Sequence, residues 1–227
     1  MVVHSSLLKQ AVARLPDPVQ DCIKRLRFRR QIRAGTFTPN EPEIAFIAEA
    51  VRPGDWVIDV GANVGHYTLP LAKAVGPSGR VIAFEPIPRT HALLAANAVF
   101  WATGNVTLIN AAASDHLSVS GMSVPELPSG SKNFYRAALA PNGGCPVVCL
   151  PIDTLQLLRI SLIKIDAEGH DLAVLNGARQ LIERYKPALI VESELEGDVA
   201  DWLRKLGYRL SMPPGSPNVI ATCGGTP

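Results

Sequence analysis

One stretch of this chain, residues 57–65, constrains the fold more than any other. It opens with the run Val-Ile-Asp-Val, which is typical of a buried strand, and continues into a turn that contains Gly61 and Gly65. Because these glycines lack a Cβ atom, the backbone can adopt unusual dihedral angles and lie directly against a ligand. The periodic segment 67–75 is typical of the helix that follows such a turn. The stretch therefore predicts a strand, a ligand-binding loop and a helix.

Apolar runs alternate with helix-like segments along the rest of the chain, which predicts an α/β fold with a parallel sheet and right-handed crossovers. A closing antiparallel pair is expected near the C-terminus, over residues 208–210 and 219–221, which flank a proline-rich turn. The expected strands of the parallel sheet are residues 57–60, 81–84, 106–109, 162–165 and 188–192, and the expected helices are residues 67–75, 90–100, 172–185 and 199–206.

The length of 227 residues suits one well-cored α/β domain and is too short for two full-sized ones. Hydrophobic residues make up 47% of the chain, which argues against disorder over most of its length. We expect residues 51–227 to form the domain and residues 1–50 to form a helical appendage. Residues 117–149 interrupt the alternation and are rich in Ser, Pro and Gly, so we expect an insertion that serves as a lid and includes a β-hairpin.

The appendage combines apolar residues at helical spacing with a high density of positive charge. We interpret it as a helix that docks on the domain and leaves a basic face in solvent. An anionic acceptor or a membrane surface is the alternative partner of that face. The apolar residues are Val19, Cys22, Ile23 and Leu26, and the basic residues are Lys24, Arg25, Arg27, Arg29, Arg30 and Arg33.

Composition and targeting signals narrow the class of protein further. The formal net charge of +2 says little about partners, and no apolar run approaches the length that spans a bilayer. The N-terminal apolar residues are interrupted by Lys9, Arg14 and Asp17, unlike a secretory signal, so we expect a cytoplasmic protein. The four cysteines lack Cys-x-x-Cys spacing, so we expect ordinary thiols rather than a zinc site or a disulfide. No motif indicates an oligomeric state.

The kind of ligand follows from the loop spacing and from the acidic residues around it. Asn63 stands where the fingerprint of a dinucleotide-binding loop has its middle glycine, which weakens an NAD interpretation. Glu85 follows the second strand, where its carboxylate can accept hydrogen bonds from both hydroxyls of a ribose. Asp59 and the later Asp166-Ala-Glu168 would repel a pyrophosphate but suit the sulfonium and ammonium groups of S-adenosylmethionine. We therefore predict an S-adenosylmethionine site.

Five motifs stand in order along the chain. They are Asp-Val-Gly-Ala-Asn-Val-Gly at 59–65, Phe-Glu-Pro at 84–86, Ile-Asp-Thr-Leu at 152–155, Lys-Ile-Asp-Ala-Glu-Gly at 164–169 and Pro-Ala-Leu-Ile-Val-Glu at 187–192. From Glu43 to the C-terminus the chain resembles the FkbM family of S-adenosylmethionine-dependent methyltransferases. The resemblance implies a class I, Rossmann-like fold: a mostly parallel seven-stranded sheet with helices on both faces and an antiparallel last strand. It also implies O-methylation of a hydroxyl on a sugar, a polyketide or a related small metabolite, without naming the acceptor.

The expected cofactor shell combines the glycine loop, the ends of the next two strands and one later carboxylate. The loop would hold the methionine end, although Asp59 has the alternative of capping the next turn and Asn63 that of tolerating a left-handed conformation. Small residues after the third strand leave room for adenine, which Ser114 or Asp115 would contact, unless the alanines there only pack the strand end. The shell comprises Asp59, Gly61, Asn63, Gly65, Glu85, Ala112, Ser114, Asp115 and Asp166.

Methyl transfer to an alcohol requires alignment of the reactants and a group that removes the hydroxyl proton. Asp166, Glu168 and His170 follow a central strand, at the edge where open α/β sheets bind ligands, and are the candidate catalytic residues. His170 is the natural base near neutral pH, but a lone histidine after a strand is more often an ordinary turn residue, and the FkbM family more often has a small or apolar residue there. A magnesium site of Asp166, Glu168 and Glu192 lacks a supporting ligand spacing, so no metal is expected.

Three other functions compete with this interpretation. The arginine-rich N-terminus would suit a nucleic-acid methyltransferase, but the chain lacks an Asn-Pro-Pro-Tyr motif and has few aromatic residues to stack flipped bases. A protein that binds S-adenosylmethionine without turnover would have the same loop. An NAD-linked oxidoreductase is disfavoured by the loop spacing. The expected partner is therefore a small-molecule hydroxyl acceptor rather than a nucleic acid.

Overall fold

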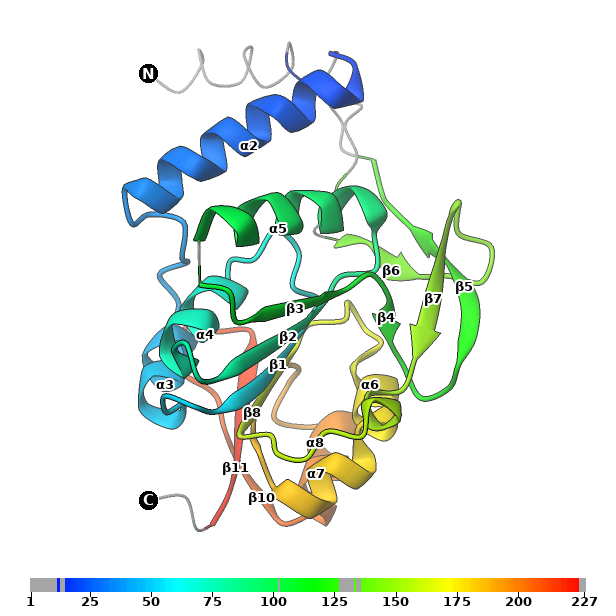
Figure 1. Ribbon diagram of the computed structural model, residues 1–227. Coiled ribbons are helices and arrows are strands. Elements are labelled where there is room, and N and C mark those ends of the chain that lie inside the picture. The colour runs from blue at the N-terminus through cyan, green and yellow to red at the C-terminus, as the bar shows by residue number, and fades with distance from the viewer. Residues whose placement is uncertain (1–11, 13–14, 102, 127–132, 134–135, 225–227) are drawn as a thin grey trace.

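The computed structural model describes residues 12, 15–101, 103–126, 133 and 136–224, and a seven-stranded sheet forms its centre (Figure 1). The strands are β1 (Trp56–Val60), β2 (Arg80–Phe84), β3 (Val106–Ile109), β8 (Leu162–Ile165), β9 (Ala188–Glu192), β10 (Tyr208–Ser211) and β11 (Asn218–Cys223). They lie in the order β3-β2-β1-β8-β9-β11-β10. The first five pair in parallel, and β11 is antiparallel to both β9 and β10. The expected Rossmann-like fold with an antiparallel last strand is confirmed.

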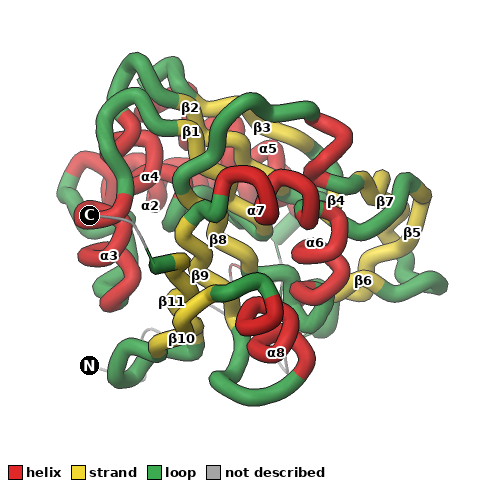
Figure 2. Tube along the Cα trace, turned by 90° about the horizontal axis from the view of Figure 1, so that it is seen from below, coloured by secondary structure: helices red, strands yellow, loops and turns green. Residues whose placement is uncertain are grey.

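Helices cover both faces of this sheet (Figure 2). One face carries α3 (Pro42–Ala50), α4 (Thr68–Val75) and α5 (Pro88–Trp101), and the other carries α6 (Asp171–Gly177), α7 (Arg179–Tyr185) and α8 (Asp198–Lys205). Side chains alternate along a strand, so Val57 belongs to the core under α3 and α4, while Ile58 belongs to the core under α6 and α7. Because both faces are covered, all four residues of β8 are buried.

The helix expected over residues 172–185 is two helices, α6 and α7, separated by a single residue. At the end of α6, a Cβ atom on Gly177 would stand 1.8 Å from the carbonyl oxygen of Ser114, so the two backbones touch there. The first turn of α7 donates its amides at residues 180 and 181 to the Asp153 carboxylate, at 2.9 and 3.0 Å. An anion at a helix N-terminus satisfies amides that lack an intrahelical partner. The Ile-Asp-Thr-Leu motif, a 3₁₀ turn, therefore anchors the start of α7.

Residues 112–150 build a second, smaller sheet beside the first (Figure 1). Its strands are β4 (Ala112–Ala113), β5 (Ser118–Ser123), β6 (Ala138–Leu139) and β7 (Cys145–Leu150), in the order β4-β7-β5-β6. β5 and β7 are antiparallel, with Val119 opposite Val148. The segment expected as an insertion, residues 117–149, therefore contributes three antiparallel strands, which include the expected hairpin pairing of β5 with β7. Residues 127–132 and 134–135 of it lie outside the described part.

The expected N-terminal helix is α2 (Asp17–Arg33), which packs against α5 (Figure 1). Arg89 of α5 forms ion pairs with Asp17 and Asp21 at 2.7 and 2.9 Å, and Phe28 is the buried residue of the helix. The apolar residues expected to dock the helix, Val19 and Leu26 among them, are exposed instead. Helical spacing identified the helix, but its docking face is built from charged pairs, Phe28 and the half-buried Ile32. Among the described residues, no helix is long and apolar enough to cross a membrane.

Candidate functional site

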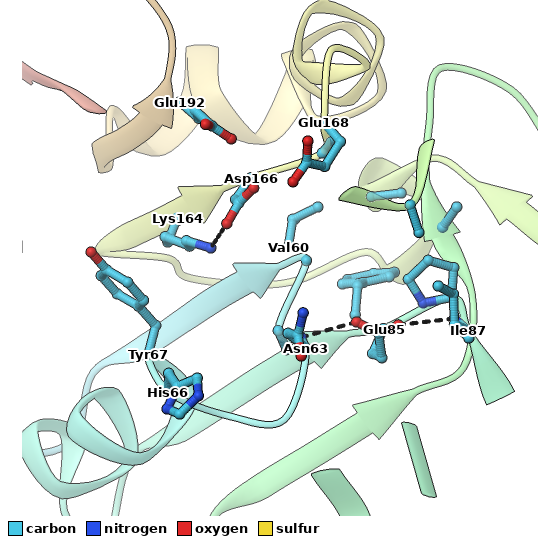
Figure 3. A pocket seen from close by; sticks show the side chains of 18 of the residues that line it. Val60, Asn63, His66, Tyr67, Glu85, Ile87, Lys164, Asp166, Glu168 and Glu192 are labelled. Carbon is cyan, nitrogen blue, oxygen red and sulfur yellow. Dashed lines mark hydrogen bonds and ion pairs between the residues drawn. The ribbon is translucent and has the colours of Figure 1, made fainter. Parts of the chain in front are cut away.

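A cavity of about 500 Å³ opens at the carboxyl ends of the central strands (Figure 3). The glycine loop, the ends of β8 and β9, the second sheet and the segment after α2 all contribute to its walls. Cavities of this size bind small molecules and cofactors. Its polar lining residues include Gln31, Glu41, Asn63, His66, Tyr67, Glu85, Lys164, Asp166, Glu168, His170, Glu192 and Asn218.

The two glycines of the first loop serve different purposes. Gly61 lines the cavity and has φ +73°, and a Cβ atom there would lie 1.9 Å from the carbonyl oxygen of Asp166. Gly65, with φ +101°, does not line the cavity, and a Cβ atom there would lie 2.3 Å from the Trp101 ring. Gly65 was expected in the cofactor shell; the structure shows instead that it lets α5 pack against the loop.

Glu85 is held by backbone donors at the end of β2. Its two carboxylate oxygens accept hydrogen bonds from the amides of Ile87 and Asn63, each at 2.9 Å (Figure 3). Burial raises the pKa of Glu85 to about 7, although both amide donors oppose the shift. A carboxylate oxygen has two lone pairs, so each can accept one more hydrogen bond from a ligand in the cavity. Asn63 itself has φ +50°. It therefore adopts the left-handed backbone conformation that the sequence allowed as an alternative role for this residue.

Asp59 lies beneath the loop and not in the cavity wall. Its side chain is fully buried, and one carboxylate oxygen accepts a hydrogen bond from the Thr68 hydroxyl at 2.6 Å. In the sheet register Asp59 is opposite Lys164 of β8. Direct contact between Asp59 and a cofactor was expected from the sequence, but Asp59 is absent from the lining residues. Its carboxylate instead faces the first turn of α4 and the neighbouring lysine.

Lys164 is a site residue to which the sequence analysis gave no role. Its ammonium nitrogen lies 2.9 Å from the Asp166 carboxylate and 4.9 Å from the centre of the Tyr67 ring (Figure 3). Burial alone would lower the pKa of Lys164, but the carboxylates of Asp166 and Asp59 outweigh it and raise the pKa. The sequence did contain a signal for this role, namely a lysine inside an otherwise apolar strand. Lysine is almost never buried unless it is paired, so a lysine in a fully buried strand indicates a buried acidic partner.

Three carboxylates meet where β8 and β9 end. Asp166, Glu168 and Glu192 each offer an oxygen within 4.8 Å of the others, and all three line the cavity (Figure 3). Burial would raise the pKa of Asp166, but the Lys164 ammonium holds it below its ordinary value. Burial and then the hydrogen bond and charge of Asp166 raise the pKa of Glu192 to about 7. The group therefore pairs an ionised carboxylate with one that titrates near neutral pH. Exposed acidic groups often cluster without an ion, and we assign no metal to them.

His170 lines the cavity and is joined to the expected adenine segment through Ser114. Its Nε2 atom lies 2.9 Å from the Ser114 hydroxyl, and burial lowers its pKa, which favours the neutral ring. Ser114 is buried and is not a lining residue, whereas Ala112 is. Asp115 is exposed and pairs with His116 at 2.6 Å, away from the cavity wall. Neither Ser114 nor Asp115 therefore lines the cavity in which adenine was expected to bind, and their contact with adenine stays a prediction.

The segment after α2 forms one wall of the cavity. The carbonyl oxygen of Phe37 lies 2.7 Å from Nδ1 of His66, which must therefore carry a proton, and the Phe37 ring packs edge-on against Phe28 at 5.7 Å. The Tyr67 hydroxyl donates to the Glu41 carboxylate. Sequence reasoning placed these residues in an appendage because no motif marks them. In the structure five residues of this segment line the cavity: Thr36, Phe37, Thr38, Pro39 and Glu41.

A glycine loop after β1, a carboxylate after β2 and a seven-stranded sheet with an antiparallel β11 define a class I, Rossmann-like methyltransferase. The sequence model of the methyltransferase FkbM domain matches residues 59–210, which is more than half of the chain. The chain belongs to the FkbM methyltransferase family. S-adenosylmethionine, the cofactor predicted from the sequence, agrees with this membership.

The chain is also similar to individual proteins, in sequence to one and in fold to others. Over 49 residues the chain is 53% identical to the 31-O-demethyl-FK506 methyltransferase FkbM of Streptomyces tacrolimicus, a match that covers 22% of this chain and 18% of that relative. The crystal structure of an FkbM methyltransferase from Methylobacillus flagellatus is similar with a TM-score of 0.56 at 18% identity, over 79% of this chain and 50% of that one. The structure of a candidate rRNA methylase from Clostridium thermocellum is similar with a TM-score of 0.53 at 15% identity, over 79% of this chain and 90% of that one. These structural matches show the fold, and the chain spans about half of the FkbM structure.

Proposed function

We propose that the protein transfers a methyl group from S-adenosylmethionine to a hydroxyl group of a sugar, a polyketide or a related small metabolite. The observation that carries this proposal is the meeting of Asp166, Glu168 and Glu192 in the cavity wall, within 4.8 Å of one another. Carboxylates accept hydrogen bonds from hydroxyl groups, and one that titrates near neutral pH can remove the hydroxyl proton. The relative from Streptomyces, named as an O-demethyl-FK506 methyltransferase, supports the same class of acceptor.

The lining residues of the cavity support a site for each part of the cofactor. Glu85 would accept hydrogen bonds from the ribose hydroxyls, and the small residues at 111–113 would lie along the adenine ring. Asp166, kept ionised by Lys164, would bind the ammonium group of the methionine end. Gly61 and Asn63 would present the loop backbone to the same end. The cofactor supplies an electrophilic methyl group on a positively charged sulfur.

The protein's own contribution to the reaction is orientation and removal of one proton. We assign the role of general base to Glu192, because its pKa is raised to about 7 and it borders the cavity. Glu192 would accept the proton of the acceptor hydroxyl, so that the oxygen electron pair is free to take the methyl group. S-adenosylmethionine would supply that methyl by breaking its carbon–sulfur bond, which leaves the electron pair on sulfur and the neutral thioether S-adenosylhomocysteine as the leaving group. Glu168 and His170, also in the wall, would hold the acceptor's other polar groups.

Two segments would exclude water from the acceptor side. Residues 36–41 close one wall through Phe37 and Glu41, so we propose that the N-terminal appendage completes the site instead of standing apart from it. Met122 and Leu139 of the second sheet also line the cavity, which supports a lid role for residues 117–149. Excluding water strengthens the electrostatic contacts within a site. A cytoplasmic location stays a prediction from the N-terminal sequence.

The test begins with calorimetric titration by S-adenosylmethionine and by NADH, followed by transfer of a labelled methyl group to a panel of sugars, hydroxylated metabolites and short RNAs. We expect binding of S-adenosylmethionine alone and methylation of a hydroxylated small molecule. Glu85→Ala is the matched control, because it should remove binding while leaving the acceptor side intact. Methylation of RNA alone, or cofactor binding with no product on any acceptor, would refute the proposal.

A further inference from the structure

Helix α2 presents apolar side chains to solvent along one face. Leu15, just before the helix, is 38% exposed, Val19 is 44% exposed, Ile23 is 38% exposed and Leu26 is 56% exposed. Residues spaced by three or four positions share one face of a helix, so Val19, Ile23 and Leu26 form a single stripe, and Leu15 precedes it in the chain. We define the outer face of α2 as this stripe together with the exposed arginines of the helix. Those arginines are Arg25, Arg27, Arg29, Arg30 and Arg33.

The opposite face of α2 is fixed to the domain. Arg89 of α5 binds the carboxylates of Asp17 and Asp21, at 2.7 and 2.9 Å, and Phe28 is buried against Phe37. Both acidic residues of the helix are therefore engaged on the docking side. The outer face carries positive charge and exposed aliphatic surface. No carboxylate of the same helix neutralises the positive charge on that face.

Charge and apolar surface are arranged along the length of the outer face. The stripe occupies its N-terminal part, and the last turn carries Arg30 and Arg33, with Arg29 just before it. Two of these arginines, Arg29 and Arg33, lie over the Phe100 ring at 5.6 and 5.3 Å, which holds them in place while they remain exposed. We propose that the outer face of α2 docks on an anionic lipid bilayer, with the stripe entering the acyl boundary and the arginines binding lipid phosphates.

A lipid surface fits this face better than a nucleic acid does. Phosphate groups of either partner would bind the arginines, but only a bilayer offers an apolar layer for four aliphatic side chains. Proteins that bind single-stranded nucleic acid place exposed aromatic faces beside their basic groups for stacking. The large exposed apolar residues of α2 are aliphatic, and the Phe100 ring beside its arginines is half-buried and lies beneath Arg29 and Arg33. Gln31 in the last turn of the same helix lines the site cavity. Docking would therefore bring one wall of the cavity close to the membrane.

The test is co-sedimentation of the full chain with vesicles of phosphatidylcholine alone and of phosphatidylcholine with an equal part of phosphatidylserine. We expect binding to the anionic vesicles only, weakened by salt. Each arginine near an anionic surface contributes about fivefold to the affinity, so R25Q/R27Q/R30Q should bind the anionic vesicles about a hundredfold more weakly than the parent. V19S/I23S/L26S should bind the anionic vesicles at least about tenfold more weakly, because it removes the apolar stripe that enters the bilayer. It leaves every charge in place.

Matched controls separate this face from charge in general. R184Q/K205Q/R209Q removes the same number of exposed charges elsewhere on the chain and should bind vesicles like the parent. Circular dichroism verifies that each variant is folded. Three results would each overturn the proposal: no binding to anionic vesicles, equal loss in the control, or an unchanged affinity of V19S/I23S/L26S. Binding of a labelled RNA that depends on the arginines, without vesicle binding, would assign the face to nucleic acid instead.

Discussion

The ammonium of Lys164 lies 2.9 Å from the carboxylate of Asp166, two residues further along the chain. Asp59 is opposite Lys164 in the neighbouring strand, and Tyr67 places its ring 4.9 Å from the same nitrogen. One buried cation therefore joins β1 and the start of α4 to the acidic cluster after β8. Buried charges persist only when they are paired, so each member of this group depends on the others.

Replacing Lys164 with methionine should destabilise the protein strongly. The change leaves the buried Asp59 carboxylate and Asp166 without their cation, and removing one partner of a buried pair costs about 3–5 kcal/mol. Urea unfolding of Lys164→Met measures the loss. Lys73→Met, at an exposed position of α4, is the control and should lie within about 0.5 kcal/mol of the parent. Equal stability of the two variants would show that Lys164 is not part of a coupled buried group.

Binding of S-adenosylmethionine should strengthen with pH through the titration of Glu85. Burial raises the pKa of Glu85 from an ordinary 4.5 to about 7, and the ionised carboxylate is the better acceptor for ribose hydroxyls. Between these values the folded protein holds the extra proton, so its stability without ligand falls as pH rises through that window. We expect a dissociation constant about tenfold higher at about pH 6 than at about pH 8.

The amide variant isolates this titration. Glu85→Gln keeps the shape of the side chain but cannot ionise, so its affinity should be weaker than that of the parent and should not change between about pH 6 and about pH 8. Calorimetry at several pH values measures both proteins. A parent affinity that is flat with pH, or a variant with the parent's slope, would assign the titration to another group.

The sequence predicted the fold well because its signals are local. Each parallel strand is a short apolar run, and the helices on both faces follow from the periodicity between the runs. The break between α6 and α7 was missed because it arises from contact between Gly177 and Ser114, which lie far apart in the chain. The exposed stripe on α2 was assigned to the wrong face for the same reason: ion pairs with Arg89 decide the orientation of the helix.

Some of the residues predicted for the site line the cavity and others do not, and the difference has a physical origin. Gly61, Asn63, Glu85, Asp166 and Glu168 follow strand ends, where the fold brings residues together, and all line the cavity. A motif lists residue types without saying which way each side chain faces. The conformation of each strand end and loop turns the side chains of Asp59, Ser114 and Asp115 away from the cavity. The wall of residues 36–41 depends on tertiary contacts that no local pattern records.

Substitution of Gly65 should be costly because of Trp101. A Cβ atom at Gly65 would lie 2.3 Å from the Trp101 ring, and its φ of +101° is itself unfavourable for alanine. Gly65→Ala should lower the free energy of unfolding by about 2–4 kcal/mol. Gly215→Ala is the control, since Gly215 has φ +79° but no neighbour within 4 Å, and it should show the cost of backbone strain alone.

A double-mutant cycle separates the steric effect from other causes. Trp101→Leu makes room for the new methyl group, so Gly65→Ala should cost at least about 1 kcal/mol less in that background. Urea unfolding of the four proteins gives the coupling energy. If the two changes were additive, or if Gly65→Ala cost no more than Gly215→Ala, contact with Trp101 would not be the reason for a glycine at this position.

Loss of the Glu192 carboxylate should slow methyl transfer without weakening cofactor binding. With a pKa of about 7, Glu192 is largely protonated in acid, so kcat of the parent should rise with pH and level off above about pH 7. Glu192→Gln should lower kcat by about 10²–10⁴ and remove this rise, while the dissociation constant of S-adenosylmethionine changes little. Glu168→Gln, in the same cluster, is the control and should keep the parent's pH profile. A Glu192→Gln protein that retains the rise would move the role of base to His170, whose ring also borders the cavity.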